Sequence, residues 1–134
     1  MQLREAVEKE LKAIVVTALR ASGFKGSFPH FRRPLPERID LLTFQFDRHG
    51  GGFVLEASQC PPEGVTTYWG KAIAPSKVTA HDLHPDSRIR VQRTPGSGTD
   101  SWFRYDQGQV QECALQVLPH LSSLERWWAL RART

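Results

Sequence analysis

The apolar positions of the chain concentrate in two neighbouring segments, 38–47 and 53–58, which are separated by a turn with three consecutive glycines. Successive side chains of a β-strand point to opposite faces of a sheet, so Phe44 and Phe46 share one face and Leu41 lies on the other. Apolar side chains therefore occupy both faces. This pattern predicts a long β-hairpin at the centre of the fold, covered by other segments on each side.

The N-terminal segment predicts a helix. Apolar residues recur every three or four positions from Leu3 to Ala21, and charged residues occupy the positions between them. This spacing gives an amphipathic helix whose apolar side can cover one face of the hairpin. Ser22-Gly23 is predicted to end the helix, because glycine readily adopts the backbone conformation that closes a helix C-terminus.

Shorter alternating segments predict the remaining strands. These segments are 30–33, 65–69, 88–93 and 101–105. Pro34 and Pro36 lack backbone donors, so a strand at 30–33 is predicted to lie at a sheet edge. Residues 70–86 show little periodicity and are predicted to be loops, with a helical turn near 78–83.

Helical spacing returns at 109–118, where Pro119 is predicted to break the helix. Ser122 and Glu125 have the spacing of a capping box, which predicts a second helix from Ser122 to about Ala132. The order of elements then predicts an α+β fold: an N-terminal helix, an antiparallel sheet of about four to five strands built on the central hairpin, and C-terminal helices packed on the sheet. The length predicts a single domain, 1–134.

Composition narrows the class of protein further. The net charge is +4, and no apolar run is long enough to cross a membrane. The amphipathic, charged N-terminus differs from a signal peptide, so we expect a cytoplasmic protein. Cys60 and Cys113, the only cysteines of the sequence, are expected to be reduced core thiols rather than a disulfide framework.

Several segments together resemble a known family. They are GFKGSFPHFRR, IDLLTFQF, GGGFVLEASQCPPEG and the Trp-Trp pair near the end. They are similar to the bacterial family catalogued as domain of unknown function 4304, and the resemblance covers most of the chain, from the first helix to Trp128. That family has no established activity, so the resemblance implies an α+β cytoplasmic domain and assigns no functional residue. Some small bacterial domains of this general type are immunity or partner-binding proteins, which is an analogy.

The sequence offers no assembled catalytic or metal-binding motif. His81, Asp82, His84 and Asp86 place two imidazoles and two carboxylates within six positions, but no third ligand of fixed spacing accompanies them, so a polar loop is the better interpretation. The glycines at 50–52 precede a strand rather than a helix, which favours a hairpin turn over a phosphate-binding loop. We therefore expect no catalytic residue, no metal and no cofactor.

The stretch 24–33 interleaves aromatic and basic residues. Its members are Phe24, Lys25, Phe28, His30, Phe31, Arg32 and Arg33. Such rings can stack on single-stranded bases while the cations contact phosphates, which makes nucleic-acid binding one hypothesis. The structural alternative is that the phenylalanines fill the core and the arginines face solvent.

The leading hypothesis is a non-enzymatic protein-binding module, immunity-type or regulatory, with an acidic protein partner. The positive charge argues against neutralising a basic nuclease and fits an acidic partner better. The candidate binding residues are Arg32, Arg33, Trp69, His81, His84 and Trp128. The alternatives are nucleic-acid binding through 24–33, which is less favoured, and a small hydrolase or ligand-binding enzyme that uses the loops of 64–86. The enzyme hypothesis predicts a pocket that joins His81 or His84 to Arg33.

Overall fold

The computed structural model describes residues 3–93 and 102–131 of the chain. Its centre is a six-stranded antiparallel sheet, in which five strands follow the order β1-β2-β3-β4-β7 and β8 also pairs with β4. These strands are β1 (Lys25–Ser27), β2 (His30–Pro34), β3 (Ile39–Phe46), β4 (Gly52–Cys60), β7 (Ile89–Val91) and β8 (Phe103–Arg104). The predicted α+β fold on a central hairpin is confirmed, with a sheet wider than the sequence suggested.

Strands β3 and β4 form the predicted central hairpin. They pair along their whole length, from Ile39 opposite Cys60 to Phe46 opposite Phe53. Both strands are buried over most of their length, and side chains on opposite faces, such as Leu41 and Phe44, are equally inaccessible to solvent. The hairpin is therefore enclosed on both sides, as its two apolar faces require.

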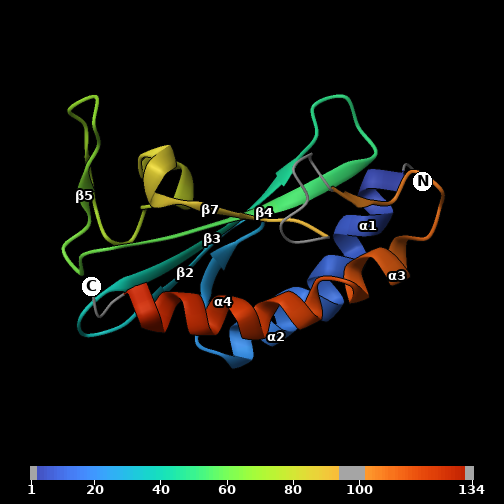
Figure 1. The fold of residues 1–134 in the computed structure, drawn as a ribbon, viewed down its shortest axis with the longest axis horizontal. Coiled ribbons are helices and arrows are strands. Elements are labelled where there is room, and N and C mark those ends of the chain that lie inside the picture. Colours follow the sequence, from blue (N-terminus) through green and yellow to red (C-terminus); the bar gives the residue numbers. More distant parts are fainter. Residues whose placement is uncertain (1–2, 94–101, 132–134) are drawn as a thin grey trace.

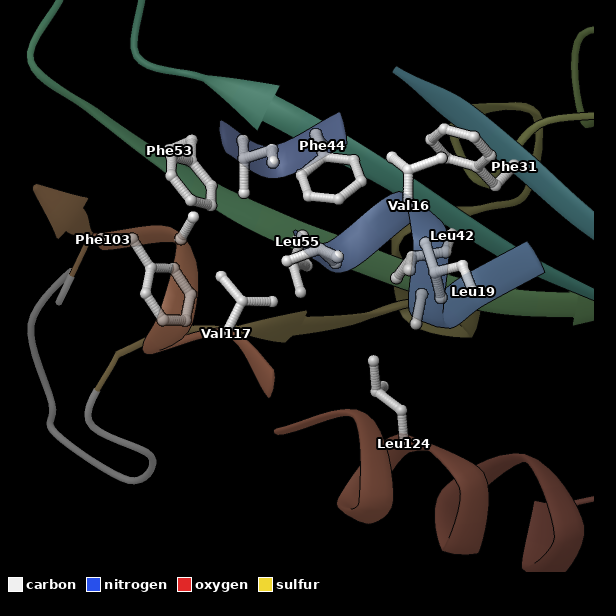
Figure 2. Packing of buried hydrophobic residues seen from close by; sticks show 14 of the residues in the cluster. Val16, Leu19, Phe31, Leu42, Phe44, Phe53, Leu55, Phe103, Val117 and Leu124 are labelled. Atoms are coloured by element: carbon white, nitrogen blue, oxygen red, sulfur yellow. The ribbon is translucent and has the colours of Figure 1, made fainter. Parts of the chain in front are cut away.

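Helices cover one face of the sheet, which we call the helical face (Figure 1). The N-terminal helix, predicted over 3–21, runs through α1 (Leu3–Leu11), a π-helical turn (Lys12–Val16) and α2 (Thr17–Ala21), and the C-terminal helices are α3 (Val110–Leu115) and α4 (Leu118–Arg131). Figure 2 shows side chains from the first helix and from α4 directed towards the Phe44 face of the hairpin. This is the main hydrophobic core.

The opposite face is covered by the segment that connects β4 to β7, residues 61–88, and we call it the loop face. This segment contains the two-stranded sheet β5 (Val65–Thr66) and β6 (Ala72–Ile73) and 3₁₀ turns at Ala80–Asp82 and Pro85–Ser87. A second, smaller core forms where Val78 and Ala80 pack against Ile39 and Leu41 of β3. In Figure 1 the β5–β6 hairpin projects away from the sheet.

Two predictions, the start of the last helix and the edge position of β2, are wrong for identifiable reasons. Helix α4 begins at Leu118, so Pro119 lies in its first turn, where the missing N–H of proline would have no intrahelical partner anyway. Ser122 is consequently inside the helix and caps nothing.

Strand β2 is not an edge strand along its whole length, because β1 pairs with its first three residues. Its end at Pro34 lies beyond β1, where a lost donor is tolerated.

The shorter strands are less extensive than predicted. The segment 65–69 forms a strand only at Val65–Thr66, since the next residues make a turn. In the last predicted strand, Ser101 lies outside the described residues, while Phe103 is buried on the helical face as the alternation indicated. The predicted turn near 78–83 is present as the 3₁₀ turn at Ala80–Asp82.

Candidate functional site

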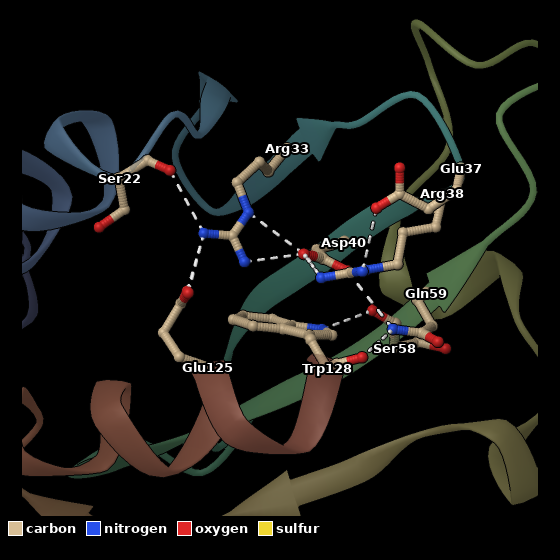
Figure 3. A network of polar contacts seen from close by, with 9 residues as sticks. All are labelled: Ser22, Arg33, Glu37, Arg38, Asp40, Ser58, Gln59, Glu125 and Trp128. Carbon is tan, nitrogen blue, oxygen red and sulfur yellow. Dashed lines mark hydrogen bonds and ion pairs between the residues drawn. The ribbon is translucent and has the colours of Figure 1, made fainter. Parts of the chain in front are cut away.

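Arg33 is the centre of a buried polar network on the helical face (Figure 3). Its Nη2 lies 2.7 Å from Oδ2 of Asp40, and its Nη1 lies 2.8 Å from Oε1 of Glu125 on α4. The Nε of Arg38 holds the other carboxylate oxygen of Asp40 at 2.8 Å. The guanidinium of Arg33 also stacks over Phe24, with its central carbon 4.7 Å from the ring centre. The predicted binding residue Arg33 is thus committed to intramolecular contacts.

The pKa of Arg33 reflects these contacts. Burial alone would lower the pKa of Arg33, but the hydrogen bonds that its guanidinium donates to Asp40 and Glu125 favour the charged form more strongly, so the net effect raises this pKa. The side chain remains a cation, and it joins β2 to β3 and to α4.

Trp128, another predicted binding residue, is only 1% exposed. Its indole Nε1 donates a hydrogen bond to the carbonyl oxygen of Ser58 (2.8 Å), and its ring packs against Phe24 with the centroids 5.3 Å apart. Gln59 donates back to the carbonyl oxygen of Trp128 (3.1 Å). Trp128 therefore fastens α4 to the sheet and presents no surface to a partner.

The phenylalanines of the stretch 24–33 belong to the core as well. Phe24 and Phe31 are buried, and the ring of Phe28 packs against Phe44 at a centroid distance of 5.0 Å. Base stacking needs exposed ring faces. The burial of these rings therefore supports the alternative that the phenylalanines fill the core, and argues against base stacking.

His81 lies on the loop face. Its ring meets the ring of His30 edge to face, with centroids 5.9 Å apart, and Nδ1 of His30 lies 2.9 Å from Oγ1 of Thr43. Burial lowers the pKa of His30, and the neighbouring His81 lowers it further. The side chain of His81 is exposed overall, but partial desolvation of its ring lowers its pKa, and the positive charge of Arg88 lowers it further. His30 and Arg33 point to opposite faces of β2, so the sheet separates His81 from Arg33. The pocket expected by the enzyme hypothesis does not form between them.

The two cysteines lie on opposite faces, and both are free and buried. Burial raises the pKa of each thiol to about 11, which keeps both protonated at neutral pH and therefore poorly nucleophilic. Within the described residues, no three His, Cys, Asp or Glu side chains group so that they could hold a metal ion.

The exposed rings of Tyr68 and Trp69 form the end of the β5–β6 hairpin. They are 69% and 54% exposed, and they contact each other with centroids 4.8 Å apart. His84, another predicted binding residue, packs against Tyr68 at 5.1 Å. We call Tyr68, Trp69 and His84 the aromatic tip. The structure thus brings Trp69 and His84 together through Tyr68, which the sequence analysis did not select.

The backbone of the tip is well defined by hydrogen bonds. The N–H of Thr67 donates to the carbonyl oxygen of Lys71 (2.8 Å), and the N–H of Lys71 donates to Oγ1 of Thr67 (2.9 Å). Gly70 closes the turn at a φ of +88°, a conformation that favours glycine. At the base, a Cβ on Gly64 would collide with the carbonyl oxygen of Ile73. In the sequence, Gly70 is the signal for this turn, because a three-residue hairpin loop ends on a residue in the left-handed conformation, which glycine adopts most readily.

These features define a class of protein: an α+β domain whose sheet is covered by helices on one face and by a segment with an aromatic tip on the other. The chain belongs to the family described as Domain of unknown function (DUF4304), whose model matches residues 15–131. No curated protein and no solved structure matches the chain. Among the described residues, no helix has the length and apolar character needed to cross a bilayer.

Proposed function

We propose that the chain is a protein-binding module that docks an acidic partner through its aromatic tip. The observation that carries this proposal is the pair of exposed rings, Tyr68 and Trp69, at the end of a hydrogen-bonded hairpin. Tyrosine and tryptophan are the residue types most often responsible for binding energy at protein interfaces. Both lie in a segment that the sheet does not need for its own main core.

The tip is favourable for binding because its rings are already ordered. Tyr68 is held by contacts with both Trp69 and His84, and the turn beneath it is fixed by hydrogen bonds of Thr67. Less conformational entropy is lost when a side chain is ordered before association, so more of the contact energy remains as affinity.

The acidic character of the partner follows from charge. The chain carries +4, and Lys71 is exposed immediately beside the tip. A positive surface speeds association with an acidic partner and disfavours a basic one. The two free thiols are compatible with the reducing cytoplasm, which we propose as the location of the protein, and an immunity-type or regulatory role fits such a module.

Comparative affinity capture tests the proposal. Wild-type chain, the double variant Tyr68→Ala/Trp69→Ala and a control variant Leu115→Ala/Leu130→Ala are immobilised in parallel and exposed to lysate of the source cells. The control removes two other exposed apolar side chains, which are 47% and 62% accessible on α3 and α4. Proteins kept by wild type and control but lost by the tip variant are identified, purified and measured by calorimetry.

We expect at least one such protein, acidic in composition, with affinity reduced about tenfold or more by the tip substitutions, the loss typical of an interface hot spot. The proposal is overturned if every retained protein binds the tip variant as tightly as wild type.

A further inference from the structure

A groove of about 350 Å³ lies at the base of the β5–β6 hairpin, where that segment meets β1, β2 and β3. We call it the basic groove. It is lined by Lys25, Arg32, Pro34, Leu35, Ile39, Pro62, Pro75 and Ser76. Its volume lies at the lower end of the range of pockets that bind small ligands, about 300–1,000 Å³.

Two cations stand directly opposite each other at this groove. Lys25 of β1 and Arg32 of β2 are partners in the strand register, so their side chains share one face of the sheet. Like charges placed directly opposite destabilise a sheet. No acidic residue lines the groove, and neither cation forms an ion pair within the described part of the chain. The arrangement lacks an internal counter-charge, and an external anion would supply one.

Arg32 is oriented for such an anion. Its Nε donates to the carbonyl oxygen of Val78 (3.2 Å), which fixes the guanidinium against the 61–88 segment. That bond uses one edge of the guanidinium and leaves Nη1 and Nη2 without a partner among the described residues. Two parallel N–H donors match the two oxygens of a carboxylate.

Apart from Ser76, the other side chains that line the groove are apolar. Three prolines, Leu35 and the buried Ile39 form its walls and floor. Pro34 has no N–H, so it cannot donate a hydrogen bond to an added strand at this position. The chemistry of the walls suits an apolar side chain inserted into the groove rather than a strand that extends the sheet.

We infer that the basic groove receives an extended acidic peptide segment of the partner, with one apolar side chain among the prolines and an adjacent aspartate or glutamate on Arg32 and Lys25. This inference rests on the proposed protein-binding function and names the chemistry of the partner. Pro62 in the groove wall and Tyr68 at the tip are six positions apart, a span of at most about 22 Å. One partner surface can therefore contact both.

Peptide selection tests the inference independently of any natural partner. A displayed library of random peptides of about eight residues, long enough to cross the groove when extended, is selected on the full-length chain. Enriched sequences are synthesised with blocked termini, so that only side-chain carboxylates are present, and their affinities are measured by fluorescence polarisation. We expect enriched peptides to place aspartate or glutamate within two positions of a leucine, isoleucine or aromatic residue.

Matched charge variants locate the binding site. Lys25→Gln/Arg32→Gln should weaken these peptides about tenfold or more, whereas Lys9→Gln/Arg126→Gln, which removes equal charge from exposed helical positions, should change affinity by less than about twofold. Lys25→Gln alone guards against misfolding, because the side chain of Lys25 is exposed and forms no hydrogen bond or ion pair with the described residues, and it should still weaken binding measurably. Failure to enrich acidic-apolar peptides, or equal loss in both double variants, overturns the inference.

Failure of the inference and failure of the proposed function remain distinguishable. The tip variant Tyr68→Ala/Trp69→Ala should retain the selected short peptides while losing the captured partner. A captured partner that depends on the tip but ignores the groove substitutions would refute the groove and leave the proposed function standing. Groove-dependent peptides without any tip-dependent protein would refute the tip and support the groove.

Discussion

The two faces of the central hairpin are covered in different ways. On the helical face, nineteen buried residues of the described part of the chain form one continuous core. On the loop face, five buried residues of this part form the second core, and the segment above it is stabilised by a two-stranded sheet and short 3₁₀ turns. Apolar burial is the dominant stabilising term in folding, so the helical face must supply most of the stability.

This difference indicates where function can reside. Two predicted binding residues, Arg33 and Trp128, lie on the helical face. Both form hydrogen bonds or ion pairs inside the protein and are not accessible to a partner. The loop face instead presents the aromatic tip and the basic groove, both built from the 61–88 segment and its neighbours.

The largest expected effect compares the two cores directly. Phe44→Ala should lower the free energy of unfolding by about 3–5 kcal/mol, because it removes a buried ring from the main core. Val78→Ala, which removes two buried methyl groups from the second core, should lower the free energy of unfolding by about 1.5 kcal/mol. Urea denaturation of both variants checks this. Equal losses would contradict the claim that the helical face supplies most of the stability.

The next effect isolates the buried polar network. Asp40→Asn should cost about 3 kcal/mol, because it leaves the charge of Arg33 enclosed without its buried carboxylate. The matched substitution Glu125→Gln removes the other carboxylate, which is 46% exposed, and should cost no more than about 1 kcal/mol. Denaturant midpoints of the two variants give the comparison, and a larger cost for Glu125→Gln would show that Asp40 is not the principal partner.

The smallest effect is a pH dependence that belongs to the loop face. The pKa values of His30 and His81 are lowered on folding, so the unfolded chain binds protons first as the pH falls. Stability should therefore be lost as the pH decreases from the ordinary histidine value of 6.5 towards the folded pKa values. Because His81 stays solvent-exposed, His30 should contribute the larger share.

Unfolding midpoints measured between about pH 7.5 and 5 provide the test. His30→Gln/His81→Gln should flatten the profile relative to wild type, and His49→Gln, at an exposed position in the β3–β4 turn, should leave it unchanged. An equally steep profile in the double variant would assign the dependence to other groups.

The sequence predicted the elements with strong periodicity. The N-terminal helix and the hairpin follow from apolar spacing, because a stripe or an alternating face has to be buried wherever the rest of the chain lies. Start signals were less reliable. Ser122 and Glu125 match a capping box, yet packing of α4 against the sheet begins the helix at Leu118, and Glu125 pairs with Arg33 instead.

The candidate site was predicted only in part. Trp69 and His84 are found together, but each contacts Tyr68 rather than the other. The position of Tyr68 depends on a turn at 68–70, and the predicted strand 65–69 includes the first two residues of this turn. Arg33 had the same basic character as Arg32 in the sequence. As neighbours in a strand, the two side chains point to opposite faces of the sheet. Long-range packing then places the helices over the face of Arg33 and the 61–88 segment over the face of Arg32.

The sequence by itself determined that a hairpin with two apolar faces would be enclosed, because alternation fixes which side chains share a face and water disfavours both sets. Only the tertiary structure decided that helices would cover one face and a loop segment the other. That decision depends on contacts between residues far apart in the chain, such as Arg33 with Glu125 and Trp128 with Ser58, and no local pattern encodes them. The same packing leaves Lys25 and Arg32 without an ion-pair partner among the described residues.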